Sequence, residues 1–156
     1  MASAIGSVAT TNERKARMAT ISLEFKGYWT KRKSLPAAAG VYCVYCCVDQ
    51  NEKTVQIRKL LYIGESGDMQ RRVTGHPLHD GWKRHCAQGE VLCYSAAEVS
   101  LEATRHQAEA ALIFKHKPPL NDEYKHSFPF ETTTMLLTGR TSKLRTSFTI
   151  QTDAKD

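Results

Sequence analysis

Residues 40–64, GVYCVYCCVDQNEKTVQIRKLLYIG, contain two apolar runs separated by a polar one. Val41 to Val48 consists of valine, tyrosine and cysteine, a composition that favours a buried strand. Asp49 to Lys53 is polar and predicts a turn, and Thr54 to Gly64 has the character of a second strand. We therefore predict a β-hairpin over this stretch.

Three further elements are predicted downstream of the hairpin. Ser66 is a good N-cap for a short helix over about residues 67–74, and residues 90–95 (EVLCYS) predict a third strand. Residues 101–117 carry the strongest helical pattern in the chain, rich in Ala, Leu and Glu, and Pro118 stops it. This mixture of strands and helices predicts an α+β domain.

A second hairpin is predicted at the C-terminal end, over residues 128–151. Its two halves, residues 128–137 and 144–151, are rich in Thr, Phe and Leu. The segment between them, Thr-Gly-Arg-Thr at 138–141, is typical of a turn.

The length of 156 residues is enough for one domain with a sizeable core. We assign that domain to residues 21–156, with its core over residues 40–121. Residues 1–20 are rich in Ala, Ser and Thr and predict a flexible leader. Residues 23–29 are interpreted as a short strand or an ordered lead-in.

The chain is basic, with a net charge of +6 and a pI of about 9.1. This charge favours a polyanionic partner, nucleic acid first among them, although many basic proteins bind none. The longest apolar run, Ala37 to Val48, is interrupted by Gly40 and is too short to span a membrane. We therefore expect no membrane association.

Five cysteines, an odd number without regular spacing, favour reduced thiols and an intracellular location. A zinc knuckle would place a Cys-x-x-Cys pair on a turn, whereas Cys43 and Cys46 fall within a strand and face opposite ways. Small buried thiols are the favoured interpretation. A cysteine nucleophile, such as Cys86 beside His85, has no supporting spacing signature.

Arg72 is the first residue that suggests a chemical site. Its planar guanidinium can contact a phosphate through several donors. On a helical wheel, Met69, Arg72, Val73 and His76 share one side, and Arg71 points elsewhere. The apolar residues tie that side to the core, so Arg72 is expected at the edge of a packed surface. The alternative is an ordinary surface arginine.

Glu109 lies in an apolar run, Ala108 to Phe114. A carboxylate flanked this closely by apolar residues is partly buried or lies at the margin of a site. Because a buried unpaired carboxylate is costly, a metal ion or another cation has to compensate it. The alternative is an exposed glutamate on a helix face, which is the interpretation kept for Glu102.

Two tyrosines, Tyr42 and Tyr62, are predicted on the paired strands, where they are either core aromatics or parts of a site. A tyrosine serves as a base only if a neighbouring cation or metal-bound water lowers its pKa from about 10. His76 is an alternative proton acceptor. The amide of Asn121 can pin the loop after the long helix, a role as readily structural as catalytic.

A short basic segment offers further phosphate contacts. Lys83, Arg84 and His85 follow Trp82, and with Arg71 they are the candidate substrate-binding residues. A basic surface turn is an equally good interpretation of this segment.

The order and spacing of these residues resemble the GIY-YIG nuclease superfamily over Gly40 to Asn121. The resemblance rests on Gly40-Val41-Tyr42, Tyr62-Ile63-Gly64, Arg72, His76, Glu109 and Asn121. It implies an α+β fold with a small three-stranded antiparallel sheet flanked by helices, to which the C-terminal β-hairpin is an extension.

The resemblance also implies chemistry. One divalent cation, Mg²⁺ with Mn²⁺ as an alternative, is held by Glu109, and Arg72 contacts the phosphate. Tyr42, Tyr62 and His76 arrange and deprotonate the attacking water. Asn121 matches the family's asparagine after the helix.

The chain departs from the family pattern in two places. The twenty residues from Tyr42 to Tyr62 exceed the spacing in compact members, so residues 49–59 are expected to extend the hairpin and to grip DNA. Glu65 stands where a basic residue is common, which weakens the case for phosphate contacts there.

We therefore expect a magnesium-dependent DNA endonuclease of the cytoplasm, nucleoid or nucleus, with DNA as its partner and a homodimer left open. Two alternatives are a catalytically silent nucleic-acid-binding protein on the same scaffold and a nuclease that acts on RNA.

Overall fold

The computed structural model describes residues 17–51 and 54–153. Residues 1–16 of the predicted leader lie outside this part, but the first strand already begins at Met18. The elements in chain order are β1 (Met18–Trp29), η1 (Arg32–Ser34), β2 (Gly40–Asn51), β3 (Thr54–Ser66), α2 (Met69–Thr74), α3 (His79–Arg84), β4 (Val91–Glu98), α4 (Glu102–His116), β5 (Thr132–Gly139) and β6 (Ser147–Ile150).

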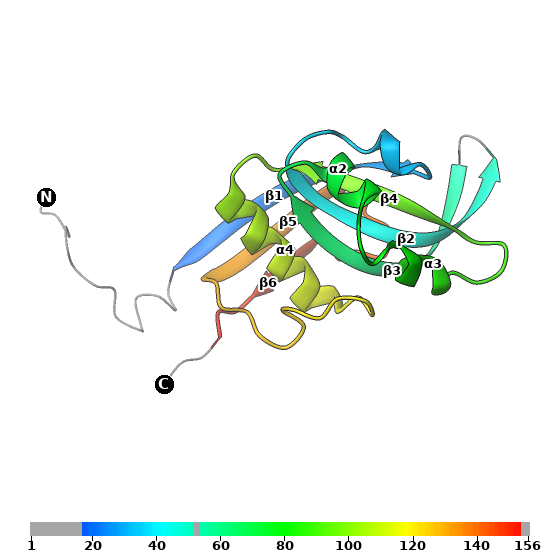
Figure 1. Cartoon of the computed structure of the whole chain (residues 1–156). Helices are drawn as coiled ribbons and strands as arrows, with labels where there is room; N and C mark the ends of the chain where they lie inside the picture. The colour runs from blue at the N-terminus through cyan, green and yellow to red at the C-terminus, as the bar shows by residue number, and fades with distance from the viewer. Residues whose placement is uncertain (1–16, 52–53, 154–156) are drawn as a thin grey trace, which may run out of the picture.

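All six strands belong to one mixed sheet with the order β3-β2-β4-β1-β5-β6. Neighbouring strands are antiparallel except β1 and β5, which run parallel from Met18↔Thr132 to Phe25↔Gly139. The sheet curls like a half-barrel, and α4 lies across it (Figure 1). The prediction of a small three-stranded sheet flanked by helices is therefore wrong.

The sheet is larger than predicted because β1 is a full-length strand that links β4 to β5. Ile21, Leu23 and Phe25 are buried and the residues between them are exposed, which is the alternation of a half-buried strand. The predicted strand over residues 23–29 covers only the C-terminal part of β1, because the Ala-, Ser- and Thr-rich residues before it have the composition of a flexible leader. Since β1 is twelve residues long, it pairs with β4 at one end and with β5 along the other.

The predicted C-terminal hairpin does exist, because β5 and β6 pair antiparallel from Thr133↔Ile150 to Leu136↔Ser147. It is not an appendage, however. Its first strand pairs with β1, so the hairpin completes the same sheet and contributes Met135 and Phe148 to the main core.

Two apolar cores lie on opposite faces of the sheet. The larger one is formed by β1, β2 and β5 against α4, with Ala108 and Leu112 of the helix fully buried. The smaller one is covered by α2 and α3, which supply Met69, Val73 and Trp82. Burial of this apolar surface on both faces is the main favourable term that holds the helices to the sheet.

The predicted β2–β3 hairpin is present and extended, but β2 runs to Asn51, three residues into the segment predicted as a turn, and β3 begins at Thr54. Its register shifts between Val44↔Tyr62 and Tyr45↔Leu60, so Leu61 is an extra residue on β3. Such a bulge re-aims the neighbouring side chains, and here Leu61 and Tyr62 both join the core beneath α2 and α3.

The cysteines are distributed over both cores. Cys43 belongs to the larger core and Cys46 to the smaller one, which confirms that they face opposite ways. Cys46 forms a disulfide with Cys86, just after α3, so the expectation of reduced thiols is wrong for this pair. The other cysteines, Cys43, Cys47 and Cys93, are free and buried. Within the described chain, no helix combines the length and the apolar character needed to cross a membrane.

Candidate functional site

The candidate site lies at the β3 edge of the sheet, between the helices of the two faces. Tyr42 on β2 stands opposite Gly64 on β3, and Tyr62 stands opposite Val44. The two tyrosine rings are 6.4 Å apart between centroids. The hairpin register therefore brings the two phenols of the motif together.

The glycines of both tripeptides are required by this packing. A Cβ atom at Gly64 would collide with the hydroxyl group of Tyr42, so a larger residue would displace that ring. A Cβ atom at Gly40 would collide with the carbonyl oxygen of Ala97 and with the side chain of Met69. Each glycine thus allows a close approach that the site needs.

Arg72 is placed by α2, which begins directly after β3. Met69 and Val73 are fully buried, which confirms the predicted buried side of the helix, whereas Arg71 and Arg72 are both exposed. The N-cap is Asp68, whose carboxylate accepts from the Arg71 amide at 3.1 Å, and not Ser66 as predicted.

Ser66 instead stabilises the turn before α2, because its Oγ accepts from the Asp68 amide at 3.0 Å. The Arg72 guanidinium lies close enough to the Tyr42 hydroxyl to influence its pKa. Tyr42 is only 1% exposed, and its burial raises its pKa, an effect that Arg72 opposes. Tyr42 is therefore a buried neighbour of the guanidinium.

His76 lies under Tyr62, with 5.3 Å between ring centroids, and its ring is 4.5 Å from that of Trp82. Its Nδ1 accepts from the Leu78 amide at 3.0 Å, so the proton of the neutral ring is on Nε2. Burial, then the nearby Arg72, lowers the pKa of His76 to about 4. The imidazole is thus neutral at pH 7 and its acceptor nitrogen is already occupied.

Glu109 reaches the site from α4 and is half-buried. Burial raises the pKa of its carboxyl to about 8, with further contributions from the negative charges of Glu65 and Glu123. A hydrogen bond from the Glu65 backbone amide acts in the opposite direction. In the described part of the chain, no lysine, arginine or histidine forms an ion pair with Glu109.

Glu65 holds α4 against β3. Its carboxylate accepts from Arg105 Nε at 3.0 Å and lies 3.2 Å from His106 Nε2. Both partners belong to the turn of α4 that precedes Glu109. Glu65, the residue that differs from the GIY-YIG pattern, therefore helps to position α4, the helix that carries Glu109.

Arg72 and Glu109 both influence the pKa values of Tyr42 and Tyr62. The Arg72 charge lowers and the Glu109 charge raises the pKa of Tyr42 and of Tyr62. Both charges are therefore within electrostatic reach of both hydroxyls, although they come from helices on opposite faces of the sheet. The structure brings together Tyr42, Tyr62, Arg72, His76 and Glu109.

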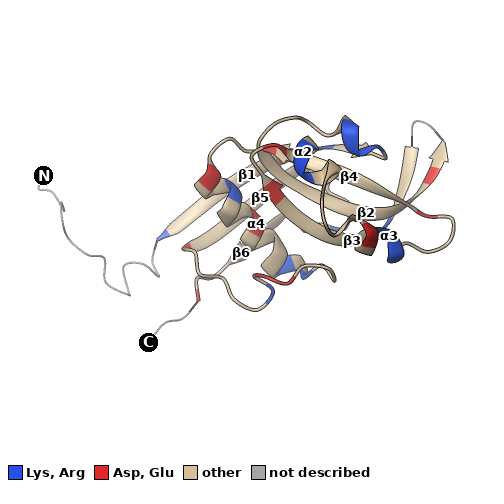
Figure 2. Cartoon of the chain, in the orientation of Figure 1, with Lys and Arg blue, Asp and Glu red and all other residues tan. Residues whose placement is uncertain are grey.

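Two cavities flank this group. The first, of about 220 Å³, is lined by Tyr62, Glu109, Ile113, Asn121, Asp122, Glu123 and Tyr124. The second, of about 890 Å³, is lined by Lys33, Ser66, Asp68, Gln70, Arg71, Arg72, Thr74 and Gly75. Figure 2 shows basic residues on η1 and α2 and both acidic and basic residues along α4, and the carboxylates that line the smaller cavity are Glu109, Asp122 and Glu123. The site therefore has an acidic side and a basic side.

Asn121 has a structural role. Its Oδ1 accepts from the Ile63 amide at 2.9 Å and its Nδ2 donates to the Ile63 carbonyl at 2.8 Å. The Leu120 amide also donates to the Leu61 carbonyl at 3.1 Å. These bonds continue the sheet beyond β3 and cover part of its open edge.

Of the candidate substrate-binding residues, only Arg71 lines the same cavity as Arg72. Lys83 lines a separate cavity on the other side of α3. Arg84 and His85 are exposed, and His85 Nδ1 bonds to the Gly81 carbonyl at 3.0 Å. The structure therefore does not bring Lys83, Arg84 and His85 into the cleft beside Arg72.

Sequence reasoning missed several residues of the site. Trp82 comes from α3, which was not predicted, and Lys33 comes from the distant η1 segment. Asp122 and Glu123 line the acidic cavity directly after Asn121. Only the acidic pair had a local signal, since two carboxylates follow a motif residue in the sequence.

No protein-family model matches this chain, and comparisons with curated proteins and with solved structures returned no match. The resemblance to GIY-YIG nucleases therefore rests on the motif residues alone.

Carboxylate oxygens are the donors that Mg²⁺ and Mn²⁺ prefer, and Glu109 offers one on the acidic side of the site. Glu109 is not part of a ready-made cluster of ligands, however: in the described part of the chain the one group of three potential ligand side chains lies elsewhere, and the Glu65 carboxylate is already paired with Arg105 and His106. The raised pKa of Glu109 means that negative charge here is not fully compensated by the protein. A divalent cation at Glu109 would therefore need water or substrate oxygens as its other ligands.

Proposed function

We propose that this protein is a divalent-metal-dependent endonuclease that hydrolyses phosphodiester bonds of DNA. The observation that supports this most is that Arg72 and the Glu109 carboxyl, which ionises at about pH 8 or when a cation binds, both lie within electrostatic reach of the same two tyrosine hydroxyls. Phosphodiester hydrolysis needs a cationic group for the phosphate, a base for the attacking water and help for the leaving oxygen.

Arg72 binds the scissile phosphate in this proposal. Its side chain is exposed, but α2 is fixed to the core by Met69 and Val73, and the buried Tyr42 hydroxyl lies close to the guanidinium. A guanidinium held in this way loses little freedom when it binds an oxyanion. Lys33 and Arg71, which line the same cavity, contact the neighbouring phosphates of the strand.

Tyr62 is the proton acceptor in this proposal. It is partly exposed and lines the acidic cavity together with Glu109, whereas Tyr42 is buried. Burial and the Glu109 charge raise the pKa of Tyr62, and Arg72 lowers it. A divalent cation on Glu109 supplies positive charge for the phosphate and for water activation. Neutralising that carboxylate also removes one cause of the raised Tyr62 pKa.

His76 supports Tyr62 and does not itself act as the base. Its Nδ1 already accepts a backbone hydrogen bond, and its ring is packed between Tyr62 and Trp82. The neutral imidazole, kept uncharged by burial and by Arg72, adds no further cation beneath the phenol.

The test is nicking of supercoiled plasmid by purified protein with Mg²⁺, with Mn²⁺ and with a chelator. Arg72→Ala and Glu109→Gln are expected to lower the rate by about 10²–10³-fold, the usual effect of removing one charge-stabilising group. Arg84→Ala and Glu102→Gln are the matched controls, because both side chains are exposed and neither lines the two site cavities. Equal cutting by all five proteins would refute the proposal and indicate a contaminating nuclease.

Two further arms of this experiment separate the alternatives. A labelled RNA of the same sequence is incubated in parallel, and cleavage of RNA in preference to DNA would replace DNA as the substrate. A gel-shift measurement on the same DNA, with binding that is unchanged in Glu109→Gln and with no cutting by any preparation, would indicate a silent nucleic-acid-binding protein.

A further inference from the structure

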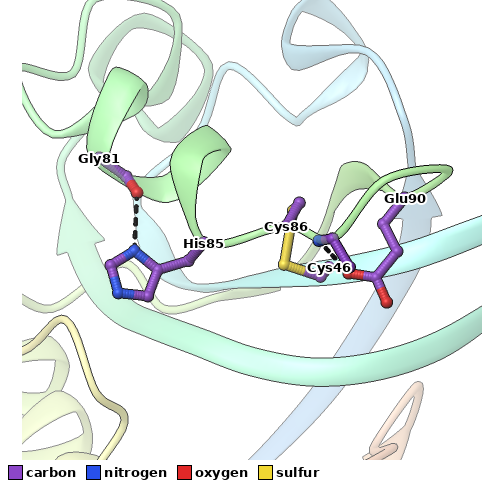
Figure 3. The surroundings of a disulfide bond; sticks show 6 residues. Cys46, Gly81, His85, Cys86 and Glu90 are labelled. Atoms are coloured by element: carbon purple, nitrogen blue, oxygen red, sulfur yellow. Dashed lines mark hydrogen bonds between the residues drawn. A yellow bond between two sulfur atoms is a disulfide. The ribbon is translucent and has the colours of Figure 1, made fainter.

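A second group of metal-binding side chains lies at the opposite end of α3 from His76. Cys46 is buried on β2, and Cys86 follows α3 and is half-buried. They form a disulfide with their Cα atoms 5.4 Å apart. The carboxylate of Glu90 lies beside them, and one ligand atom from each of the three residues lies within 4.8 Å of the others (Figure 3).

A tight turn fixes Glu90 in this position. Its Oε1 accepts from the Ala87 amide at 2.8 Å, and its own amide donates to the Ala87 carbonyl at 3.0 Å. One of the two carboxylate oxygens of Glu90 is therefore occupied by a hydrogen bond within the turn. Among the described residues, none is found to donate a hydrogen bond to the other oxygen, so it is available to a ligand.

The sulfur pair is accessible from solvent on one side. A cavity of about 350 Å³ is lined by Cys86 and Glu90 together with Lys31, Arg32 and Lys83. Nearby cations favour the thiolate form of a cysteine, because they stabilise its negative charge. In contrast, Cys46 is fully buried, so a reductant reaches the disulfide through Cys86.

We propose that the reduced Cys46 and Cys86, together with Glu90, bind one zinc-class cation, and that the disulfide and the metal-bound dithiolate are alternative states of the same site. Zinc is a borderline-soft cation that binds both thiolates and carboxylates, and the two thiolates favour it over Mg²⁺. Three protein ligands would leave a fourth position for water, which can enter from the cavity that Cys86 and Glu90 line. This ligand set differs from the all-oxygen side of the Glu109 site, so the two sites select different metals.

Conversion from one state to the other requires a dithiol reductant. Its thiolate attacks the Cys86 sulfur, the bond between the two cysteines breaks, and Cys46 leaves as a thiolate. The second thiol of the reductant then displaces Cys86 and closes a disulfide within the reductant. Two electrons have passed to the cysteine sulfurs, and the cation takes the place of the two protons that the thiols would otherwise carry.

Both states connect α3 to β2. This matters for the other site, because α3 carries Trp82, whose ring packs 5.2 Å from that of Tyr62. The connection therefore persists through a change of redox conditions, as long as the cation is present.

The test is titration of the reduced, folded protein with Co²⁺ under anaerobic conditions, after the dithiol has been removed. A thiolate–cobalt charge-transfer absorption that saturates at one ion per chain is expected. The oxidised protein and Cys86→Ser are expected to lack it, and Glu90→Gln to bind at least about 10-fold more weakly. Cys93→Ser is the matched control, since Cys93 is a buried cysteine on the neighbouring strand.

Three results would overturn the proposal: no thiolate–cobalt absorption in the reduced protein, full absorption in Cys86→Ser, or unfolding of the reduced chain despite added Co²⁺, as judged by near-ultraviolet circular dichroism. Glu109→Gln has to retain the absorption. The result is therefore independent of whether the nuclease proposal holds.

Discussion

Replacing Glu109 by glutamine measures how much the ionised carboxylate lowers the free energy of unfolding. In the folded chain its pKa is raised from 4.5 to about 8, chiefly by burial and then by Glu65 and Glu123. Between these two pH values the folded state holds a proton that the unfolded state has lost. The free energy of unfolding therefore falls as the pH rises from about 4.5 to about 8, and it is constant with respect to this group outside that window.

The size of the effect follows from the same values. Each pKa unit corresponds to about 1.4 kcal/mol, so a rise from 4.5 to about 8 gives an upper value of about 5 kcal/mol. Because Glu109 is only half-buried, solvent screening reduces this, and we expect about 2–4 kcal/mol. Glutamine keeps a carbonyl oxygen that can accept from the Glu65 amide but cannot ionise.

The assay is urea denaturation of the wild type and of Glu109→Gln at pH 5 and pH 9 with a chelator present. The two proteins are expected to differ by less than about 1 kcal/mol at pH 5, and the variant to be more stable by about 2–4 kcal/mol at pH 9. Glu102→Gln, on the exposed first turn of α4, controls for a general charge effect. Mg²⁺ at pH 9 is expected to stabilise the wild type but not Glu109→Gln.

A stability difference between wild type and Glu109→Gln that is the same at both pH values would refute this reasoning. So would stabilisation of both proteins by Mg²⁺ to the same extent, because the cation would then bind elsewhere.

Three further predictions concern the packing around the site. Gly64→Ala is expected to destabilise the fold by about 1–3 kcal/mol, because its Cβ overlaps the Tyr42 hydroxyl; an unchanged melting temperature would contradict this. Asn121→Ala removes both hydrogen bonds to the Ile63 backbone and is expected to cost about 2–4 kcal/mol in urea denaturation, whereas a loss below about 0.5 kcal/mol would argue against a structural role. Tyr42→Phe removes the hydroxyl beside the Arg72 guanidinium and is expected to slow plasmid nicking about 10–100-fold while stability changes by less than about 1 kcal/mol; full activity would remove Tyr42 from the site.

Local features of the fold were predictable because their signals are local. The β2–β3 hairpin follows from two β-type runs and a polar turn, and α4 follows from a long helical pattern that ends before Pro118. The wheel of α2 also gave the correct buried side, with Met69 and Val73 inward. In each case the residues that determine the element are close together in the sequence.

The architecture was not predictable in this way, because it depends on a pairing between distant segments. Met18 pairs with Thr132, and no feature of either segment alone specifies the other as its partner. Cys46 and Cys86, forty residues apart, are another example. Their contact depends on where α3 packs, and α3 itself is a six-residue helix with a weak local pattern.

The candidate site shows the same division. Arg72 and Glu109 were selected from motif spacing and from their apolar neighbours, and both lie beside the two tyrosines. The contacts that position them, such as that of Glu65 with Arg105, involve charged residues whose sequence context is ordinary. These residues come into contact only because α4 packs against β3.

The parallel pair of β1 and β5 determines how the chain can be divided. A fragment that ended at Asn121 would contain every motif residue, yet β1 would lose the partner along its first eight residues and present an open edge. The core beneath α4 would also lose Met135 and Phe148. Unpaired edges of this kind promote aggregation between chains. Because the closing contact joins segments more than a hundred residues apart, we expect the sheet to be completed late in folding, and we expect the part of the chain that carries the motif residues to aggregate without the tail.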